Sequence, residues 1–245
     1  MTAIALLGPV LTQTPVTHAD DVLARMRDID RLLDPHDGIS CFNRLYLAVT
    51  EGVLAAAAQN RYVSPLFVTT LDVAFANLYF AALRAFGEGA SNVPRAWLPL
   101  FEARGTSTVA PIQFALAGMN AHINRDLPVA LVDTFAALGM SGGGDAATHA
   151  DYERVNDLLA TTETQVKDGY LCDLARTVDA EFHGVDDVVA MWSVRTAREG
   201  AWTNGDALWH LRGVPAFREK YLVALDRMTG FAARGLLFPT GRPRP

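Results

Sequence analysis

Hydrophobic residues recur along this chain at the three- and four-residue spacing of amphipathic α-helices. In residues 17–34, one helix face carries the apolar side chains of Val22, Met26, Ile29 and Leu33. The alternation of polar and apolar residues that is typical of β-strands is missing from the sequence. The pattern therefore predicts an all-α fold, a single multi-helix domain of roughly eight to ten helices.

Proline, glycine and capping residues divide this pattern into segments. Pro128 is expected to end or kink the helix that begins at Pro111, because proline has no backbone N–H to donate. The helical domain is predicted over residues 17–238, after an N-terminal extension, 1–16, and before a disordered tail, 239–245. The predicted helices cover residues 17–34, 41–59, 66–86, 94–104, 111–128, 152–182, 188–202, 206–212 and 215–237.

Composition narrows the range of partners. Half of the 245 residues are hydrophobic and a fifth are charged, so a sizeable buried core is expected. The net charge of −6 argues against nucleic acid or an anionic membrane surface as the main partner. No apolar stretch approaches the length of about 18 residues that a membrane span needs, so no span is predicted. The two cysteines, Cys41 and Cys172, fit no metal-binding spacing and favour reduced thiols in a cytoplasmic protein.

The segment GMNAHINRDLP is unusual because polar side chains interrupt a helix of small and apolar residues. His122 and Asp126 lie one turn apart and share a helix face, and Asn120 and Asn124 form a second such pair beside it. Arg125 is expected to point away from this arc. A buried polar group without a partner costs about 1–3 kcal/mol, so this much polarity indicates either a functional site or a buried network.

Other predicted helices carry polar stripes of the same kind. Residues 188–202 place Arg195 and Glu199 one turn apart, between Trp192 and Trp202. If these stripes converge, they enclose a small-molecule pocket with a histidine, carboxylates, an arginine and aromatic walls. Two earlier helices add the polar residues Asn43 and Tyr46, and Asp72 and Tyr79.

The candidate residues have expected roles and simpler alternatives. His122 with Asp126 is predicted to act in acid–base catalysis, and Arg195, beside Glu199, to hold or polarise a carbonyl or carboxylate. The alternatives are a local His–Asp hydrogen bond, an ordinary helical ion pair and tryptophans that belong to the core. No cofactor is predicted, and a divalent metal, if bound, would use His122, Asp126 and Glu199. The substrate is predicted to contact Asn120, Asn124, Asn43, Tyr46, Asp72, Tyr79, Trp192 and Trp202.

Several strings resemble the motif blocks of a helical family of unknown function found mainly in actinobacteria. They are CFNRLYLAVTEGV, LDVAFANLYFAALRAF, WLPLFEAR, IQFALAGMNAHINRDLPVALV and RTAREGAWTNGDALWHLR. This resemblance covers most of residues 38–235 and implies an all-α fold without an established activity.

A more distant resemblance is to the fold of zinc-dependent phospholipase C and P1 nuclease. Proteins of that fold carry a helical H-x-x-x-D before a proline, as His122, Asp126 and Pro128 do here. Their later H-x-x-x-E corresponds to Arg195 and Glu199, with arginine in place of histidine. The resemblance implies a degraded metal site in this chain.

Together these features favour an enzyme of bacterial specialised metabolism that uses acid–base chemistry on a small, partly apolar substrate. Cyclisation, dehydration or isomerisation suits such a site. Two alternatives stay open, namely a metal-dependent hydrolase related to phospholipase C and a non-catalytic ligand-binding or interaction protein. The expected assembly is a monomer or a homodimer.

Overall fold

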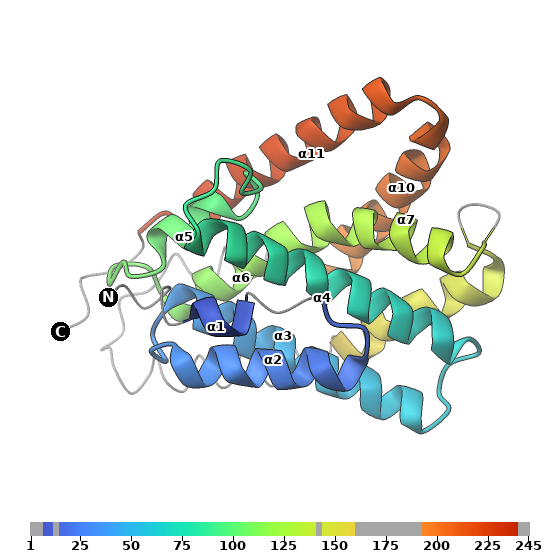
Figure 1. The fold of residues 1–245 in the computed structure, drawn as a ribbon, viewed down its shortest axis with the longest axis horizontal. Coiled ribbons are helices and arrows are strands. Elements are labelled where there is room, and N and C mark those ends of the chain that lie inside the picture. The colour runs from blue at the N-terminus through green and yellow to red at the C-terminus, as the bar shows by residue number, and fades with distance from the viewer. Residues whose placement is uncertain (1–6, 12–14, 141–143, 160–192, 240–245) are drawn as a thin grey trace.

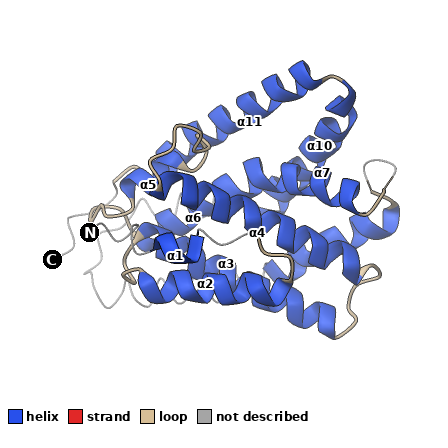
Figure 2. Ribbon diagram, in the orientation of Figure 1, coloured by secondary structure: helices blue, strands red, loops and turns tan. Residues whose placement is uncertain are grey.

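The computed structural model describes residues 7–11, 15–140, 144–159 and 193–239 (Figure 1). All regular secondary structure in these ranges is helical, so the predicted all-α class is confirmed (Figure 2). Residues 146–159 are also helical but carry no label. The other elements are labelled. They are α1 (Gly8–Leu11), α2 (Ala19–Leu32), α3 (Gly38–Ala58), α4 (Pro65–Gly87), α5 (Leu98–Ala103), α6 (Pro111–Ala121), the π-helical turn η2 (His122–Asp126), α7 (Leu127–Ala137), α10 (Val194–His210), the 3₁₀ turn η3 (Leu211–Gly213) and α11 (Pro215–Leu236).

Capping residues explain where several helices begin. Asp37 caps α3, because its side chain accepts a hydrogen bond from the N–H of Ile39 at 2.9 Å. Ser193 caps α10 in the same way, accepting from the N–H of Thr196 at 3.3 Å. Proline opens both α4 and α6, as predicted, in the first turn where its missing N–H has no consequence.

α6, η2 and α7 follow one another without a break and form the central line of the molecule (Figure 1). α3 packs along α6, α4 and α10 pack along α7, and α11 contacts α6 and η2. Every residue from Ile112 to Ala121 is buried, so α6 is surrounded by protein. At Gly118 a Cβ atom would lie 2.4 Å from the Phe42 ring. Glycine at this position therefore allows α3 to pack closely against α6.

Pro128 was predicted to end or kink the central helix, and the expectation that it ends the helix is wrong. The helix continues through η2, where the N–H of Leu127 bonds to the carbonyl of His122, an i to i+5 bond. Pro128 follows as the second residue of α7 and has no N–H to donate within this continuous helix. The wider turn thus absorbs the proline, and such π-turns occur frequently at functional sites.

Other predicted helix boundaries also change. The helices predicted over 188–202 and 206–212 form one helix, α10, in the part of the chain that is described. Gly205 does not interrupt it, because a Cβ there would lie 3.0 Å from a side chain of α7, and close packing outweighs the low helix propensity of glycine. The helix predicted over 152–182 is helical as far as residue 159, and the remainder lies outside the described residues.

The packed core begins before the predicted start of the domain. Leu7, Leu11 and Val16, which fall in the predicted extension 1–16, are buried in the core cluster. Most of the predicted tail, 239–245, lies outside the described residues.

α4 has the length and apolar composition of a membrane-crossing helix. Half of its most apolar stretch is buried within the fold, where α4 packs against α7 and η2. This is consistent with the expected absence of a membrane span, because the core helix of a globular protein has the same composition.

Candidate functional site

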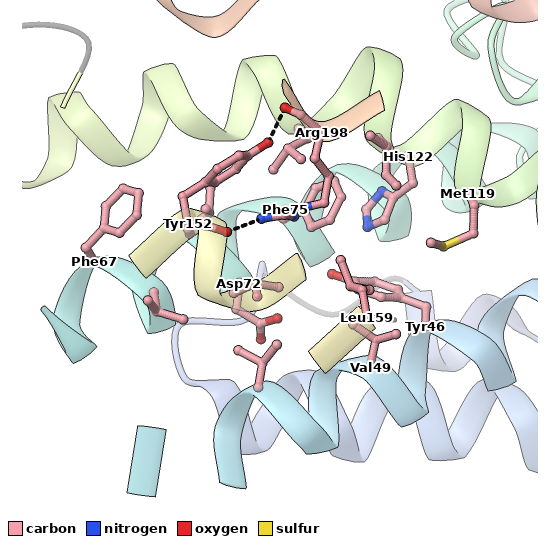
Figure 3. Close-up of a pocket in the computed structure, with 16 residues that line it drawn as sticks. Tyr46, Val49, Phe67, Asp72, Phe75, Met119, His122, Tyr152, Leu159 and Arg198 are labelled. Atoms are coloured by element: carbon pink, nitrogen blue, oxygen red, sulfur yellow. Dashed lines mark hydrogen bonds between the residues drawn. The ribbon is translucent and has the colours of Figure 1, made fainter. Parts of the chain in front are cut away.

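A cavity lies where α3, α4, η2, the helical residues 146–159 and α10 meet (Figure 3). The space inside that water-sized molecules can reach is about 60 Å³. Most of the lining side chains are aliphatic or aromatic, so the interior is apolar. The polar side chains in the wall are Tyr46, Asp72, His122, Tyr152 and Arg198.

His122 is held rigidly in this wall. Its side chain is 1% exposed, and Phe75 from α4 stacks on its ring with a centroid separation of 3.4 Å and an interplanar angle of 6°. Tyr46 from α3 approaches the same ring edge-on at 4.4 Å between centroids. Because the ring is clamped from two helices, its two nitrogens face fixed directions.

The hydrogen-bond network around Asp126 determines the tautomer of His122. The indole N–H of Trp97 donates to Asp126 Oδ2 at 2.9 Å, and Arg125 Nη1 donates to Oδ1 at 2.7 Å. A carboxylate with these donors can only accept, so His122 Nδ1, 3.2 Å from Oδ2, carries the proton and donates it. In the neutral ring, Nε2 is therefore the acceptor nitrogen.

This arrangement corrects the prediction that Arg125 points away from the polar arc. The guanidinium bonds to Asp126 and also lies 3.9 Å from Asp226 of α11. Asp126 is fully buried, and a buried carboxylate needs a cation and further donors to offset its desolvation. Arg125 and Trp97 supply them.

Burial keeps His122 neutral. It lowers the pKa of His122 from the ordinary value of 6.5, and the hydrogen bond and charge of Asp126 oppose this shift only in part. Nε2 is buried and makes no hydrogen bond within the described residues. A buried acceptor without a partner is costly, which marks this atom as one that a ligand would contact.

Two further polar groups of the cavity wall resemble His122 Nε2 in lacking a hydrogen-bond partner. Asp72 Oδ2 and the Tyr46 hydroxyl are buried and have no hydrogen-bond partner in the part of the chain described. Burial raises the pKa of Asp72 from 3.8 to about 7. Burial, followed by the charges of Asp72 and Asp126, raises the pKa of Tyr46 well above its ordinary value. Figure 3 shows the Asp72 carboxyl, the Tyr46 hydroxyl and the His122 ring directed toward the same space.

Arg198 brings a positive charge to the cavity wall. Its Nε donates to Asn156 Oδ1 at 2.7 Å, and its Nη2 donates to the carbonyl of Tyr152 at 2.8 Å (Figure 3). The guanidinium also lies 4.0 Å from the centre of the Tyr152 ring, whose hydroxyl donates to the Arg198 carbonyl at 2.6 Å. Burial raises the pKa of Tyr152 to about 12, so this hydroxyl stays protonated.

The arginine of the cavity is therefore Arg198, and not Arg195, to which the sequence pattern gave this role. The sequence contains a signal for Arg198, because it is the charged member of an otherwise apolar buried stripe of α10. The other buried residues of α10 are Val194, Ala201, Gly205, Leu208 and Trp209.

The structure does not bring Arg195 and Glu199 to the cavity. The Arg195 side chain is 55% exposed and pairs with Glu153 at 3.5 Å and Asp157 at 3.2 Å. Glu199 is exposed, and neither residue lines the cavity. Trp202 is half-buried and packs behind the wall, against residues such as Tyr152, rather than in it.

The asparagines and Tyr79 predicted to bind substrate instead hold helices together. Asn120 Nδ2 donates to the carbonyl of Thr229 in α11 at 3.0 Å, and Asn120 Oδ1 accepts from Asn124 at 3.0 Å. Asn43 Nδ2 donates to a carbonyl of α2 at 2.9 Å, and the Tyr79 hydroxyl is 3.5 Å from Asn43 Oδ1. For these residues the buried network is the better explanation. Trp192 lies outside the described residues.

The donor groups do not fit the metal site considered for His122, Asp126 and Glu199. His122 and Asp126 bond to each other instead of facing a common point, and both oxygens of Asp126 already accept hydrogen bonds. Glu199 is exposed. Within the described ranges, no three His, Cys, Asp or Glu side chains are grouped as metal ligands.

Comparison with known proteins places the chain in a family but supplies no activity. No curated protein and no solved structure matches it, so the likeness to phospholipase C and P1 nuclease gains no support. A family model matches residues 19–239, which include the whole central line α6–η2–α7 and all the described residues of the cavity wall. As its motif blocks had predicted, the chain belongs to a helical family of unknown function, DUF5995.

Proposed function

We propose that this protein is an enzyme that catalyses proton transfer on a small, largely apolar substrate, with His122 as general base and Asp72 as general acid. The observation that carries the proposal is His122 Nε2, which is buried in the wall of an apolar cavity without a hydrogen-bond partner among the described residues. Asp126 holds the ring in the tautomer that leaves this nitrogen free to accept a proton.

The environments of the two groups suit these opposite roles. Burial lowers the pKa of His122 and raises the pKa of Asp72 to about 7, so near neutral pH the base is unprotonated while Asp72 retains its proton in part. His122 Nε2 removes a proton from one position of the substrate, and Asp72 delivers a proton to another position or to a leaving hydroxyl. A base and an acid placed in this way can catalyse isomerisation, dehydration or cyclisation. After each turnover His122 loses its proton to solvent and Asp72 regains one.

A purely structural network explains less of the geometry than a site that binds a ligand. A structural network accounts for Asn43, Asn120 and Asn124, whose side chains have protein partners. It does not account for Nε2, because leaving a buried acceptor unsatisfied costs about 1–3 kcal/mol.

Deuterium exchange tests the proposal before the substrate is known. The protein is incubated in D₂O with a small-molecule extract of the cells that produce it, and mass spectra are compared for compounds that gain deuterium or change composition. His122→Asn keeps an N–H donor near the Nδ1 position, facing Asp126, and removes Nε2. We expect the rate of exchange or conversion to fall about 10²–10⁴-fold, the usual contribution of a general base.

The matched control is His210→Asn, the same chemical change at the exposed end of α10, and it should leave the rate unchanged. Asp72→Asn removes the proposed acid and serves as a second test if His122→Asn proves poorly folded by circular dichroism. Equal rates for folded His122→Asn and the unaltered protein would exclude His122 as the base.

A further inference from the structure

Arg198 is the most unusual residue of the cavity wall that the proposed chemistry does not use. Its side chain is 5% exposed, yet its hydrogen bonds go to two uncharged acceptors, Asn156 Oδ1 and the Tyr152 carbonyl. Within the described residues no carboxylate lies at ion-pair distance from the guanidinium, and its Nη1 makes no hydrogen bond there. Buried arginines are normally paired with an anion, because an isolated buried charge is costly.

The remaining wall does not neutralise this charge. The His122 ring is neutral, and the Tyr46 hydroxyl is protonated. Asp72 is the one carboxyl group among the described residues that line the cavity, and it forms no ion pair with Arg198. Burial raises the pKa of Asp72 to about 7, so near neutral pH this carboxyl is only partly charged.

The space between these groups is apolar and small. Side chains such as Phe67, Leu71 and Phe75 lie along it, and its volume of about 60 Å³ restricts the ligand to a small body. An anionic group bound at Arg198 would then place the far end of such a body near His122. The planar guanidinium matches a carboxylate in particular, because both groups are flat and can form two parallel hydrogen bonds.

We propose that the ligand of this cavity is a compact monocarboxylate, with its carboxylate on Arg198 and an apolar body that presents the reacting group to His122. This inference rests on the proposed function, because it names the class of substrate for the same site. Arg198 then takes over the role that the sequence interpretation had given to Arg195.

Binding of simple probes tests the inference without the natural substrate. Benzoate carries a carboxylate on one ring, and benzamide, benzyl alcohol and benzylamine are uncharged or cationic analogues of similar size. Binding is followed by titration of the full-length protein in NMR, with the Arg198 Nε–H resonance assigned from its loss in Arg198→Gln. We expect benzoate to bind at least tenfold more tightly than each analogue and to shift this resonance.

Variants of Arg198 test whether its charge, rather than its structural hydrogen bonds, is responsible for binding the carboxylate. Arg198→Gln keeps an N–H donor for the Tyr152 carbonyl and removes the charge, so benzoate affinity should fall at least tenfold while benzamide affinity stays within about twofold. Arg195→Gln, the same change at an exposed position of α10, should alter neither affinity. If Arg198→Gln does not fold, Arg198→Lys retains the charge and should keep a preference for benzoate over benzamide. Equal binding of benzoate and benzamide by the unaltered protein would overturn the inference.

Failure here can be told apart from failure of the proposed function. If benzoate shows no preference while His122→Asn still abolishes deuterium exchange, the enzyme assignment stands and the ligand class is wrong. If benzoate binds through Arg198 while His122→Asn leaves exchange unchanged, the cavity binds a carboxylate without His122 acting as base.

Discussion

His122 with Asp126, and Arg195 with Glu199, are both pairs of potential partners one helical turn apart, yet they occupy opposite environments. The first pair is buried at the centre of the fold, and its members bond to each other at 3.2 Å. The second pair lies on the outer face of α10, where Arg195 turns to Glu153 and Asp157 of a neighbouring helix. The i, i+4 spacing determines that two side chains share a helix face, but not whether that face is buried.

The neighbours of each pair decide the difference. α6 is buried on all sides before His122, and packing of neighbouring helices against α6 and η2 leaves His122 and Asp126 almost no access to solvent. α10 has one narrow buried stripe, which passes through Arg198 and misses both Arg195 and Glu199. An ion pair on the exposed face of α10 therefore contributes little to stability, whereas the buried carboxylate of Asp126 depends on its hydrogen bonds within the fold.

Asp126→Ala should have the largest effect on stability. It leaves the Trp97 indole N–H, the Arg125 guanidinium and His122 Nδ1 without their acceptor in a buried region. We expect the free energy of unfolding in urea to fall by about 3–5 kcal/mol. Glu199→Ala, the corresponding change on α10, should stay within about 0.5 kcal/mol. Losses of similar size in both variants would mean that the contrast between the two pairs is wrong.

Asp72→Asn should change stability in a pH-dependent way. In the folded protein the pKa of Asp72 is about 7, against 3.8 ordinarily, so the folded state retains a proton that the unfolded state loses as pH rises through this interval. The unaltered protein therefore loses stability from about pH 4 to pH 7 relative to Asp72→Asn, by on the order of 1 kcal/mol or more.

Thermal unfolding at a series of pH values measures this difference. The titratable groups that share the cavity wall are Tyr46, His122, Tyr152 and Arg198, and they are present in both proteins, so the comparison isolates Asp72. His122, with its lowered pKa, instead reduces stability as pH falls below about 6.5. A stability difference between Asp72→Asn and the unaltered protein that does not change with pH would contradict the raised pKa.

Glycine-to-alanine changes in α6 and in α10 should shift the free energy of unfolding in opposite directions. In Gly118→Ala the new Cβ would meet the Phe42 ring at 2.4 Å, and Phe42 is itself packed against Trp97 and Tyr79, so overpacking should cost about 1–3 kcal/mol. In Gly200→Ala on α10 the Cβ meets open space, and helix propensity should raise stability by about 0.5–1 kcal/mol. Denaturant midpoints at unchanged slope would measure both. Two changes of the same sign would show that packing does not distinguish these helices.

Much of the fold could be predicted because its helices follow their own sequence periodicity. The starts of α4 at Pro65 and of α6 at Pro111 depend on residues close in sequence. The π-turn could not be predicted in this way, because it reconciles the tight packing of α6 with the missing N–H of Pro128.

The composition of the site depends on contacts between distant segments, and there the local pattern was insufficient. Asp72 and Tyr46 were predicted to face a ligand, but the raised pKa of Asp72 arises from burial by several helices and has no signal in its own helix. Asn120 was predicted to contact substrate, yet its partner is a backbone carbonyl 109 residues further along the chain. Side chains that satisfy distant backbone groups and side chains that await a ligand look alike in sequence.

The smallest expected effect is the energetic coupling between Arg195 and Glu199. Because Arg195 Nη1 and Nη2 are directed to Glu153 and Asp157, a double-mutant cycle between Arg195→Gln and Glu199→Gln should give a coupling energy of about 0–0.5 kcal/mol. The single change Arg195→Gln should cost little, and that cost should shrink at high salt, because the ion pairs it breaks are exposed to solvent. Deuterium exchange should be unaffected by either variant. A coupling energy above about 1 kcal/mol, or a loss of exchange in Arg195→Gln, would show that this pair turns inward and that the two regions are more alike than their burial indicates.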